Sequence, residues 1–460
     1  MTTYYKNERS DNLKSTIRRL EGFFETIALS VLYYVVWWYL YRGTRRFPGY
    51  EGRGKYVLMG VYFILLLVLF YFCEGYAFGH RRLVDVVAAQ WVSLTIVNMI
   101  TYLQLSLIAN VLISPGPILV LEAAGFVLSL LLCYIFTAIY HANYVPRNMV
   151  MVYGSQDSLS LKFKLETRPD KYSVTTLVQE SKGYDKIIEE IEKHDAVIIN
   201  DVHGQLRNDI IKYCYDNGVR SYVAPKISDI VLGGASSVNL FDTPLLLVKG
   251  MGLTPNERIV KRGFDVVLCL LSMVVAGPLM LLIALAIKLD DGGPVFYRQE
   301  RVTRHGELFW ILKFRSMVTD AEKEGEALAA TDDDPRITRV GKFLRRTRLD
   351  ELPQILNILG GSMSICGPRP ERKEFNEEYT KQIPEFPMRL KVKGGLTGYA
   401  QIYGKYNTSA YDKLRLDLMY IENYSILLDI KLILMTLRIL FSKESTKGFE
   451  EQVLETKAQG

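Results

Sequence analysis

Two adjacent carboxylates, Asp350 and Glu351, have the neighbours in this chain that best suit chemistry on a phosphate group. Arg345, Arg346 and Arg348 lie within the five residues that precede Asp350. A carboxylate can act as a nucleophile or as a metal ligand, and arginine presents a planar set of donors to phosphate oxygens. We therefore predict a site in which one carboxylate attacks phosphorus, the other binds a metal ion, and the arginines hold an anionic substrate.

Pro353 predicts where these carboxylates lie, because proline is tolerated only in the first turn of a helix. The pair is expected at the start of a helix over residues 354–359, where the helix dipole keeps carboxylates ionised with a low pKa. Two alternatives remain open at this point. The pair could simply cap that helix, and each arginine could belong to a solvated basic face.

The composition of the chain bounds its class. Its 460 residues are too many for one core and suggest about three domains. Because 49% of them are hydrophobic, a wholly soluble protein is not expected, and the net charge of +6 favours anionic partners such as phosphates or acidic lipids. The five cysteines are scattered, and no nucleic-acid motif is present, so we predict neither zinc, nor disulfides, nor nucleic-acid binding.

Four segments in the first third of the chain are long and apolar enough to cross a bilayer, which takes roughly 20 residues. They are residues 23–41, 56–72, 83–111 and 118–140. We predict that residues 1–145 form a four-helix transmembrane domain. Basic residues lie on both sides of the first segment (Arg18 before it, Arg45 after it), so the charge pattern does not fix its orientation.

Strands and helices alternate after Asn148, which predicts a Rossmann-like α/β domain over residues 146–250. The expected strands are residues 149–154, 195–200 and 219–223, and the expected helices are residues 187–193 and 208–216. The first turn, residues 154–158, lacks the GxGxxG spacing that brings a backbone close to a pyrophosphate. A structural or regulatory domain without a dinucleotide is therefore favoured.

A further apolar run, residues 264–287, is interrupted in the middle by Gly277 and Pro278. At about 1.5 Å per residue, the run is long enough to cross a bilayer once. Alternatively, it forms a re-entrant helix that bends at this point, because proline removes a backbone bond and kinks a helix. Basic residues at both ends, Arg262 and Lys288, suit two anchors on one membrane face and favour re-entry.

Six short motifs follow one another over about 140 residues of the C-terminal part. They are Lys261-Arg262-x-Phe264-Asp265, Gly293-Pro294-Val295-Phe296-Tyr297-x-Gln299-x-Arg301, Lys313-Phe314-Arg315-Ser316-Met317, Leu349-Asp350-Glu351-Leu352-Pro353-Gln354, Gly367-Pro368-Arg369-Pro370 and Leu396-Thr397-Gly398-x-Ala400-Gln401. Together they resemble the bacterial sugar transferases, the monotopic phosphoglycosyl transferase superfamily. With the preceding domains, the whole chain resembles the large polyprenyl-phosphate hexose-1-phosphate transferases. The resemblance implies that residues 251–460 form an α/β catalytic domain, in which residues 264–287 are the re-entrant helix.

The resemblance also implies a reaction. A hexose 1-phosphate passes from a UDP-hexose to undecaprenyl phosphate with release of UMP, as the first membrane step of capsule, exopolysaccharide or O-antigen synthesis. Asp350 is implied as the nucleophile that forms an aspartyl–phosphosugar intermediate, and Glu351 as the ligand of Mg²⁺. The motifs further imply substrate or phosphate contacts from seven residues, which are Lys313, Arg315, Arg345, Pro368, Arg369, Asp417 and Tyr420.

The implied reaction fixes the expected topology. UDP-sugars are cytoplasmic, so the catalytic domain is expected on the cytoplasmic face of the bacterial inner membrane, and the helix at residues 264–287 is expected to be re-entrant. The two domains in front of the catalytic domain favour a homodimer in contact with membrane lipid. Two departures from the family pattern are Gly277, where serine is typical, and Arg348, where serine is commoner. No residue discriminates glucose from galactose as the transferred sugar.

Two other functions are compatible with parts of the sequence. A glycosyltransferase that moves only the sugar would release UDP and would need no carboxylate nucleophile. A membrane scaffold or sensor would leave the last domain inert, which the intact Asp350 and Glu351 argue against.

Overall fold

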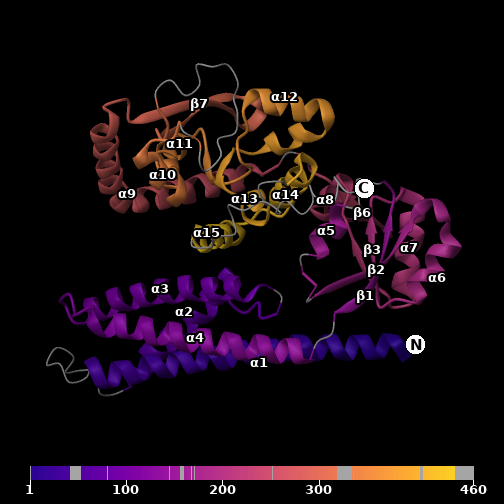
Figure 1. The fold of residues 1–460 in the computed structure, drawn as a ribbon, viewed down its shortest axis with the longest axis horizontal. Coiled ribbons are helices and arrows are strands. Elements are labelled where there is room, and N and C mark those ends of the chain that lie inside the picture. The colour runs from indigo at the N-terminus through magenta and orange to yellow at the C-terminus, as the bar shows by residue number, and fades with distance from the viewer. Residues whose placement is uncertain are drawn as a thin grey trace. The chain divides into compact units, whose positions relative to one another are not determined.

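The fold was obtained as a computed structural model (Figure 1). It describes residues 2–41, 53–79, 81–143, 146–155, 160–166, 168–169, 171–250, 252–318, 334, 336–404 and 408–440. These residues form two compact units, one that ends at Lys226 and one that begins at Ile227. The two units are considered separately below.

The first unit starts with four long apolar helices. They are α1 (Thr2–Val36), which the π-helix η1 (Trp37–Tyr41) continues, α2 (Gly54–Cys73), α3 (Leu83–Ile108) and α4 (Gly116–Asn143). Each of the four is long and apolar enough to cross a membrane, as is α9 in the second unit. The predicted spans are therefore confirmed as helices, while Arg45 in the first loop lies outside the described residues.

Polar side chains inside this bundle are paired with one another. The Nε2 of Gln90 donates to Glu25 at 3.0 Å and to the carbonyl of Gly75 at 2.9 Å, and the hydroxyl of Tyr62 donates to Asn98 at 2.9 Å. Hydrocarbon offers no partner to a polar group, so such residues turn toward the interior of a bundle. The apolar side chains are thereby left to cover the outside of the helices.

A parallel four-stranded sheet follows in the same unit, in the order β2-β1-β3-β4. Its elements are β1 (Arg147–Tyr153), α5 (Ser160–Glu166), β2 (Tyr172–Gln179), η3 (Glu180–Lys182), α6 (Tyr184–Glu192), β3 (Ala196–Asn200), α7 (Gly204–Asp216) and β4 (Arg220–Val223). Apolar residues of α6 and α7 pack on one face of the sheet, and those of α5 pack on the other. The three predicted strands are confirmed, and β2 was missed.

The second unit begins earlier in the sequence than the predicted boundary at residue 250. It includes α8 (Ile227–Gly233) and the antiparallel hairpin of β5 (Ser236–Leu240) and β6 (Thr243–Leu247). Ile227 and Ile230 of α8 are buried in the main core of this unit, where α8 contacts α14. Residues 227–250 therefore belong with the catalytic motifs and not with the parallel sheet.

The helix α9 (Pro255–Asp291) runs through the predicted re-entrant segment without a break in its assignment. Thr254 and Glu257 form a capping box that fixes its first turn. Pro278 lies inside the helix, and the ribbon of α9 bends along its length (Figure 1). A proline inside a helix accounts for such a bend, because it removes a backbone donor and crowds the preceding turn.

The remaining elements of the second unit pack around α9. They are β7 (Phe296–Val302), η4 (Arg304–Gly306), β8 (Leu308–Phe314), α10 (Arg339–Thr347), η5 (Leu349–Glu351), α11 (Gln354–Gly360), β9 (Ser364–Cys366), α12 (Lys373–Gln382), η6 (Phe386–Lys391), β10 (Gly395–Thr397), α13 (Tyr399–Tyr403), α14 (Ala410–Glu422) and α15 (Ile426–Leu440). The main core joins α9, α11, β9, α14 and α15, with Ile358, Leu414, Leu418 and Leu432 wholly buried.

Candidate active site

The carboxylate pair lies in the single 3₁₀ turn η5, between α10 and α11. The helix α11 begins only at Gln354, and Pro353 takes the capping position before it. The pair therefore precedes the helix instead of occupying its first turn, which corrects the sequence prediction. The cause is Arg348, whose left-handed backbone (φ 55°) ends α10 and directs the chain into a tight turn.

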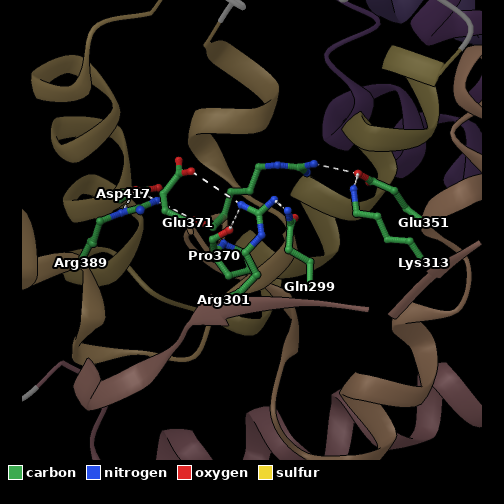
Figure 2. A network of polar contacts seen from close by, with 9 residues as sticks. Gln299, Arg301, Lys313, Glu351, Pro370, Glu371, Arg389 and Asp417 are labelled. Atoms are coloured by element: carbon green, nitrogen blue, oxygen red, sulfur yellow. Dashed lines mark hydrogen bonds and ion pairs between the residues drawn. The ribbon is translucent and has the colours of Figure 1, made fainter. Parts of the chain in front are cut away.

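Glu351 receives two cations on one carboxylate oxygen. Its Oε1 accepts from the Nζ of Lys313 at 3.2 Å and from the Nη2 of Arg369 at 2.7 Å, and Figure 2 shows Lys313 reaching this carboxylate. Burial alone would raise the pKa of Glu351, but the charges of Arg369 and Lys313 hold that pKa well below its usual value. Glu351 is therefore an ionised carboxylate with a fixed position.

Asp350 has a different environment from its neighbour. It forms no salt bridge with a described residue, and burial raises the pKa of its carboxyl above the usual value, although the charges of Lys313 and Arg345 oppose the shift. The predicted low pKa is therefore right for Glu351 and wrong for Asp350, because burial outweighs more distant cations. The two adjacent carboxylates divide their roles, one held by cations and one left available.

Two of the three arginines before the pair act on it electrostatically. The charge of Arg345, in the last turn of α10, lowers the pKa of Asp350, and the charge of Arg348 lowers that of Glu351. The side chain of Arg346 is exposed. Arg345 and Arg348 thus add positive charge around the carboxylate pair.

Asn357 fixes the carboxylate turn to the strand that carries Lys313. Its Oδ1 accepts from the backbone N–H of Leu312 at 2.8 Å, and its Nδ2 donates to the carbonyl of Trp310 at 2.8 Å. Because these bonds join α11 to β8, Lys313 and Glu351 are brought together by two rigid elements. We call Asp350, Glu351, Lys313 and Arg369 the carboxylate site from here on.

The turn that carries Arg369 is built on a short parallel pair of strands, β9 and β10. The N–H of Gly367 donates to the carbonyl of Thr397 at 2.8 Å, and the N–H of Gly395 donates to the carbonyl of Pro368 at 2.8 Å. A Cβ atom at residue 367 would lie 2.5 Å from the carbonyl oxygen of Lys393, so only glycine allows this approach. Pro368 contributes its backbone carbonyl to the turn.

The sequence analysis missed Arg389, which holds the same turn from beneath. Its Nη2 donates to the carbonyl of Arg369 at 2.9 Å, and its Nε donates to Asp417 at 2.8 Å. Both Arg389 and Asp417 are almost fully buried. Asp417, predicted as a substrate contact, thus bonds to Arg389, which in turn bonds to the backbone of Arg369. No local spacing could reveal the pair, because 28 residues separate its members.

Tyr420 also supports the site from within the core. Its hydroxyl contacts the carbonyl of Cys366 at 3.1 Å and the carboxylate of Asp429 at 2.9 Å, and Asp429 receives the Nζ of Lys261 at 2.6 Å. We call Lys261, Asp429 and Tyr420 the support cluster. It joins α9, α14 and α15 to the strand that leads into the Arg369 turn.

Arg315 lies apart from the carboxylate site. It is buried on the C-terminal side of β8 and pairs with Asp291 at the end of α9, so the structure gives it a role in holding that helix. Gly277 and Pro278 lie in the middle of α9. The structure does not bring these three predicted residues together with Asp350.

Arg301 belongs near the site, although the sequence analysis did not single it out. Its Nη1 donates to the carbonyl of Pro370 at 3.2 Å, and its Nη2 donates to Gln299 at 2.6 Å, as Figure 2 shows. Both residues stand in one of the six motifs, which was the available signal. The Arg369 turn is therefore held by Arg301 on one side and by Arg389 on the other.

The donor set fits a hard divalent cation such as Mg²⁺. The described residues use only Oε1 of Glu351 for hydrogen bonds, so the Oε2 atom remains an oxygen ligand next to Asp350. No cluster of three or more metal-ligating side chains is found among the described residues. Magnesium commonly binds through one or two carboxylates together with substrate phosphates, so this sparse set suits it.

Comparison with known proteins places the motifs in a family. Residues 256–443 match the family described as "Bacterial sugar transferase". The chain is similar to a UDP-glucose:undecaprenyl-phosphate glucose-1-phosphate transferase of Escherichia coli (strain K12), with 43% identity over 210 residues, which are 45% of this chain and 43% of that protein.

Two further relatives show how far the similarity extends. A UDP-N-acetylgalactosamine-undecaprenyl-phosphate N-acetylgalactosaminephosphotransferase of Aeromonas hydrophila is 31% identical over 325 residues, or 69% of this chain and 72% of that protein. A UDP-glucose:undecaprenyl-phosphate glucose-1-phosphate transferase of Klebsiella pneumoniae is 37% identical over 61% of this chain and 60% of its own length. The chain thus spans less than two thirds of the first and third of these relatives.

Proposed function

This chain belongs to the bacterial sugar transferase family, and from that premise we propose that it transfers a hexose 1-phosphate from a UDP-sugar to undecaprenyl phosphate and releases UMP. The named relatives carry out transfers of this kind with glucose or N-acetylgalactosamine. The product would begin the synthesis of a capsule, an exopolysaccharide or an O-antigen.

In the first half of the reaction, an oxygen of Asp350 attacks the phosphorus that carries the sugar. The bond from this phosphorus to the bridging oxygen of UMP breaks, and UMP leaves with the electron pair. Lys313, Arg345 and Arg369 supply positive charge around the phosphate oxygens as this charge shifts. Ionised Asp350 is the reactive form, and the charges of Lys313 and Arg345 favour it.

In the second half, a phosphate oxygen of undecaprenyl phosphate attacks the phosphorus of the aspartyl intermediate. The acyl phosphate bond to Asp350 breaks, the carboxylate is regenerated, and undecaprenyl diphosphate hexose is formed. A covalent intermediate divides one difficult transfer into two easier displacements. Two substrates as different as a nucleotide sugar and a lipid phosphate can then react one after the other at Asp350.

Mg²⁺ is part of this proposal, with Glu351 as its protein ligand. When bound there, it would neutralise the diphosphate and polarise its oxygens. Chelation with EDTA should abolish UMP release, and added Mg²⁺ should restore it. Full activity after chelation would overturn the metal requirement without affecting the role of Asp350.

One observation carries the proposal more than any other. Lys313 and Arg369 both donate to Oε1 of Glu351, while Asp350 beside it has no salt bridge to a described residue. A carboxylate pair that served only to cap α11 would occupy its N-cap position or first turn, but Pro353 holds the N-cap position and no side chain caps this helix. The arrangement suits one ligand and one nucleophile.

The decisive experiment is to measure the released nucleotide. Purified protein in lipid would receive Mg²⁺, undecaprenyl phosphate and a panel of UDP-glucose, UDP-galactose and UDP-N-acetylgalactosamine, with Asp350→Asn alongside. UMP release that Asp350→Asn abolishes would support the transfer and identify the sugar. UDP release that survives in Asp350→Asn would instead support a glycosyltransferase, and no release from any donor would favour the scaffold reading.

The membrane arrangement is also a proposal. We infer that α1 to α4 cross the bacterial inner membrane, that α9 re-enters it without crossing, and that the catalytic unit faces the cytoplasm. The bend and the internal proline of α9 support re-entry. Reporter fusions after residues 146 and 440 should both report the cytoplasm, whereas opposite locations would indicate that α9 crosses.

We also propose that the parallel sheet is a Rossmann-like domain and that the protein forms a homodimer. The strand order and the helices on both faces support the first statement. The hairpin of β5 and β6 supports the second, because Phe241 at its tip is 96% exposed beside other exposed apolar residues. The mass of the protein in native lipid discs would decide between one copy and two.

A further inference from the structure

A pocket with several cationic side chains lies in the second unit at the N-terminal part of α9. It has a volume of about 190 Å³, and six of the residues that line it are cationic, against a single carboxylate, Asp265. The cations are Arg258, Lys261, Arg262, Arg304, Lys391 and Lys393. None of them belongs to the carboxylate site, so this positive charge needs a separate explanation.

Part of this charge is used to hold the protein together. Lys261 is paired with Asp429, and Asp265 accepts from the Oγ of Ser364 at 2.7 Å. Arg262 donates to the carbonyls of residues 358 and 359, and the Nζ of Lys393 donates to the carbonyl of residue 361. These last two cations therefore cap the C-terminal end of α11, where the helix dipole is negative.

The remaining charge is only partly compensated by protein groups, since Arg258 donates to the carbonyl of Leu253 and the charge of Lys391 acts on Glu422. Among the described residues, the half-buried side chains of Arg304 and Lys391 have no hydrogen-bond or ion-pair partner. The crowding of like charges is evident at Lys393, whose pKa is lowered by burial and by the charges of Arg262 and Arg304. An anion in this pocket would relieve that repulsion.

The position of the pocket indicates where such an anion would come from. Ile259, Val260 and Val267, on another side of the same part of α9, are 71%, 56% and 58% exposed. The pocket thus lies where the surface of α9 changes from polar to apolar. If the apolar side enters a bilayer, the pocket is level with the lipid headgroups.

We propose that this pocket binds the phosphate group of an anionic membrane phospholipid. The pocket is distinct from the carboxylate site, because Glu351 precedes the N-terminal end of α11 and Arg262 and Lys393 bind its C-terminal end. A helix of this length separates the two by roughly 10 Å. The inference rests on the proposed membrane insertion of α9 and not on the proposed reaction.

The test is lipid binding by the full-length protein in detergent, measured by native mass spectrometry. Phosphatidylglycerol would be titrated into the wild type and into the double variant Arg304→Gln/Lys391→Gln, which removes the two cations without a described protein partner. The matched control is Lys373→Gln/Lys381→Gln, which removes the same charge from the exposed face of α12. Phosphatidylcholine and inorganic phosphate would be run as separate arms.

We expect the double variant to bind phosphatidylglycerol at least about ten-fold more weakly than the wild type, while the control variant binds as the wild type does. Phosphatidylcholine should bind weakly, and inorganic phosphate should not displace the lipid. Equal lipid binding by the wild type and the double variant would overturn the proposal. Displacement by millimolar inorganic phosphate would also overturn it, because the site would then bind a soluble anion. UMP release by the same variants would be measured separately. A failure of the lipid-binding proposal can then be told apart from a failure of the proposed reaction.

Discussion

The catalytic unit contains two groups of charged residues that differ in how completely they are paired. In the support cluster, Lys261, Asp429 and Tyr420 are buried and bonded to one another. In the carboxylate site, Glu351 is paired while Asp350 has no salt bridge to a described residue, and Arg369 keeps 42% of its side chain exposed. The first group fixes elements in place, and the second keeps charge available for a substrate.

Because of this difference, substitutions of similar residue types should have different effects on stability and activity in the two groups. A buried ion pair that loses one member leaves an unpaired charge in the core, which is costly for folding. A partly exposed carboxylate can lose its charge with less effect on folding, but the chemistry that depends on it stops. Stability and activity should therefore respond to separate substitutions.

The largest effect is expected for Glu351→Gln. The change removes the negative charge that we propose as the ligand of Mg²⁺ while it preserves the shape of the side chain, so the rate of UMP release should fall by about 100-fold or more. Single-turnover measurements with saturating UDP-sugar would test this. The variant should lose less stability than Asp429→Asn, because Lys313 and Arg369 keep 20% and 42% of their side chains exposed, against 9% for Lys261. A variant with normal turnover would show that Glu351 is only a structural partner of Lys313 and Arg369.

Asp429→Asn should have the opposite profile. It leaves the charge of Lys261 without its partner in the core, so the free energy of unfolding should fall by about 3 kcal/mol. Denaturation of the detergent-solubilised protein would measure this change. Turnover per folded molecule should fall much less than in Glu351→Gln. A loss of turnover without a loss of stability would mean that the support cluster takes part in the reaction. The two groups of charged residues would then not differ in function.

Tyr420→Phe should give a smaller effect of the same kind. It removes a hydroxyl that contacts both Cys366 and Asp429, and the lost hydrogen bonds should cost about 1–2 kcal/mol of unfolding free energy. The KM for the UDP-sugar should stay near that of the wild type, because the hydroxyl lies in the core. A large rise in KM with unchanged stability would instead make Tyr420 a substrate contact.

Arg348→Gly should have the smallest effect on stability, and it should be favourable. The backbone at this position is left-handed, which costs an ordinary residue about 1 kcal/mol that glycine avoids. Turnover should nevertheless fall by roughly three-fold, because the charge near Glu351 is lost. Arg348→Asn, which tolerates the same backbone, is the matched control for charge. Unchanged turnover in both variants would exclude Arg348 from the site.

Much of the fold could be predicted because it depends on local patterns. The four bundle helices, β1 and β3 follow from apolar runs, β4 follows from the alternation of strands and helices, and Asp350 and Glu351 stand out by their neighbours. The strand β2 was missed because only Val178 in it is fully buried, so its sequence lacks a continuous apolar run.

The supporting residues of the site could not be predicted in the same way. Lys261 and Asp429 are 168 residues apart, and Arg389 and Asp417 are 28 apart. Such pairs leave no spacing in the sequence, since only the folded chain brings them together. Arg315 gives another example: a motif implied a phosphate contact for it, whereas its ion pair with Asp291 at the end of α9 could not be read from the sequence.

The bond from Arg389 to Arg369 has a consequence for how this enzyme could be diversified. Arg389 binds the carbonyl oxygen of residue 369, a group that every amino acid carries. The turn is therefore held in place whatever side chain occupies that position. A library of substitutions at residue 369 would vary the charge beside Glu351 on an unchanged backbone, so the electrostatic contribution of this side chain can be measured separately from the shape of the turn.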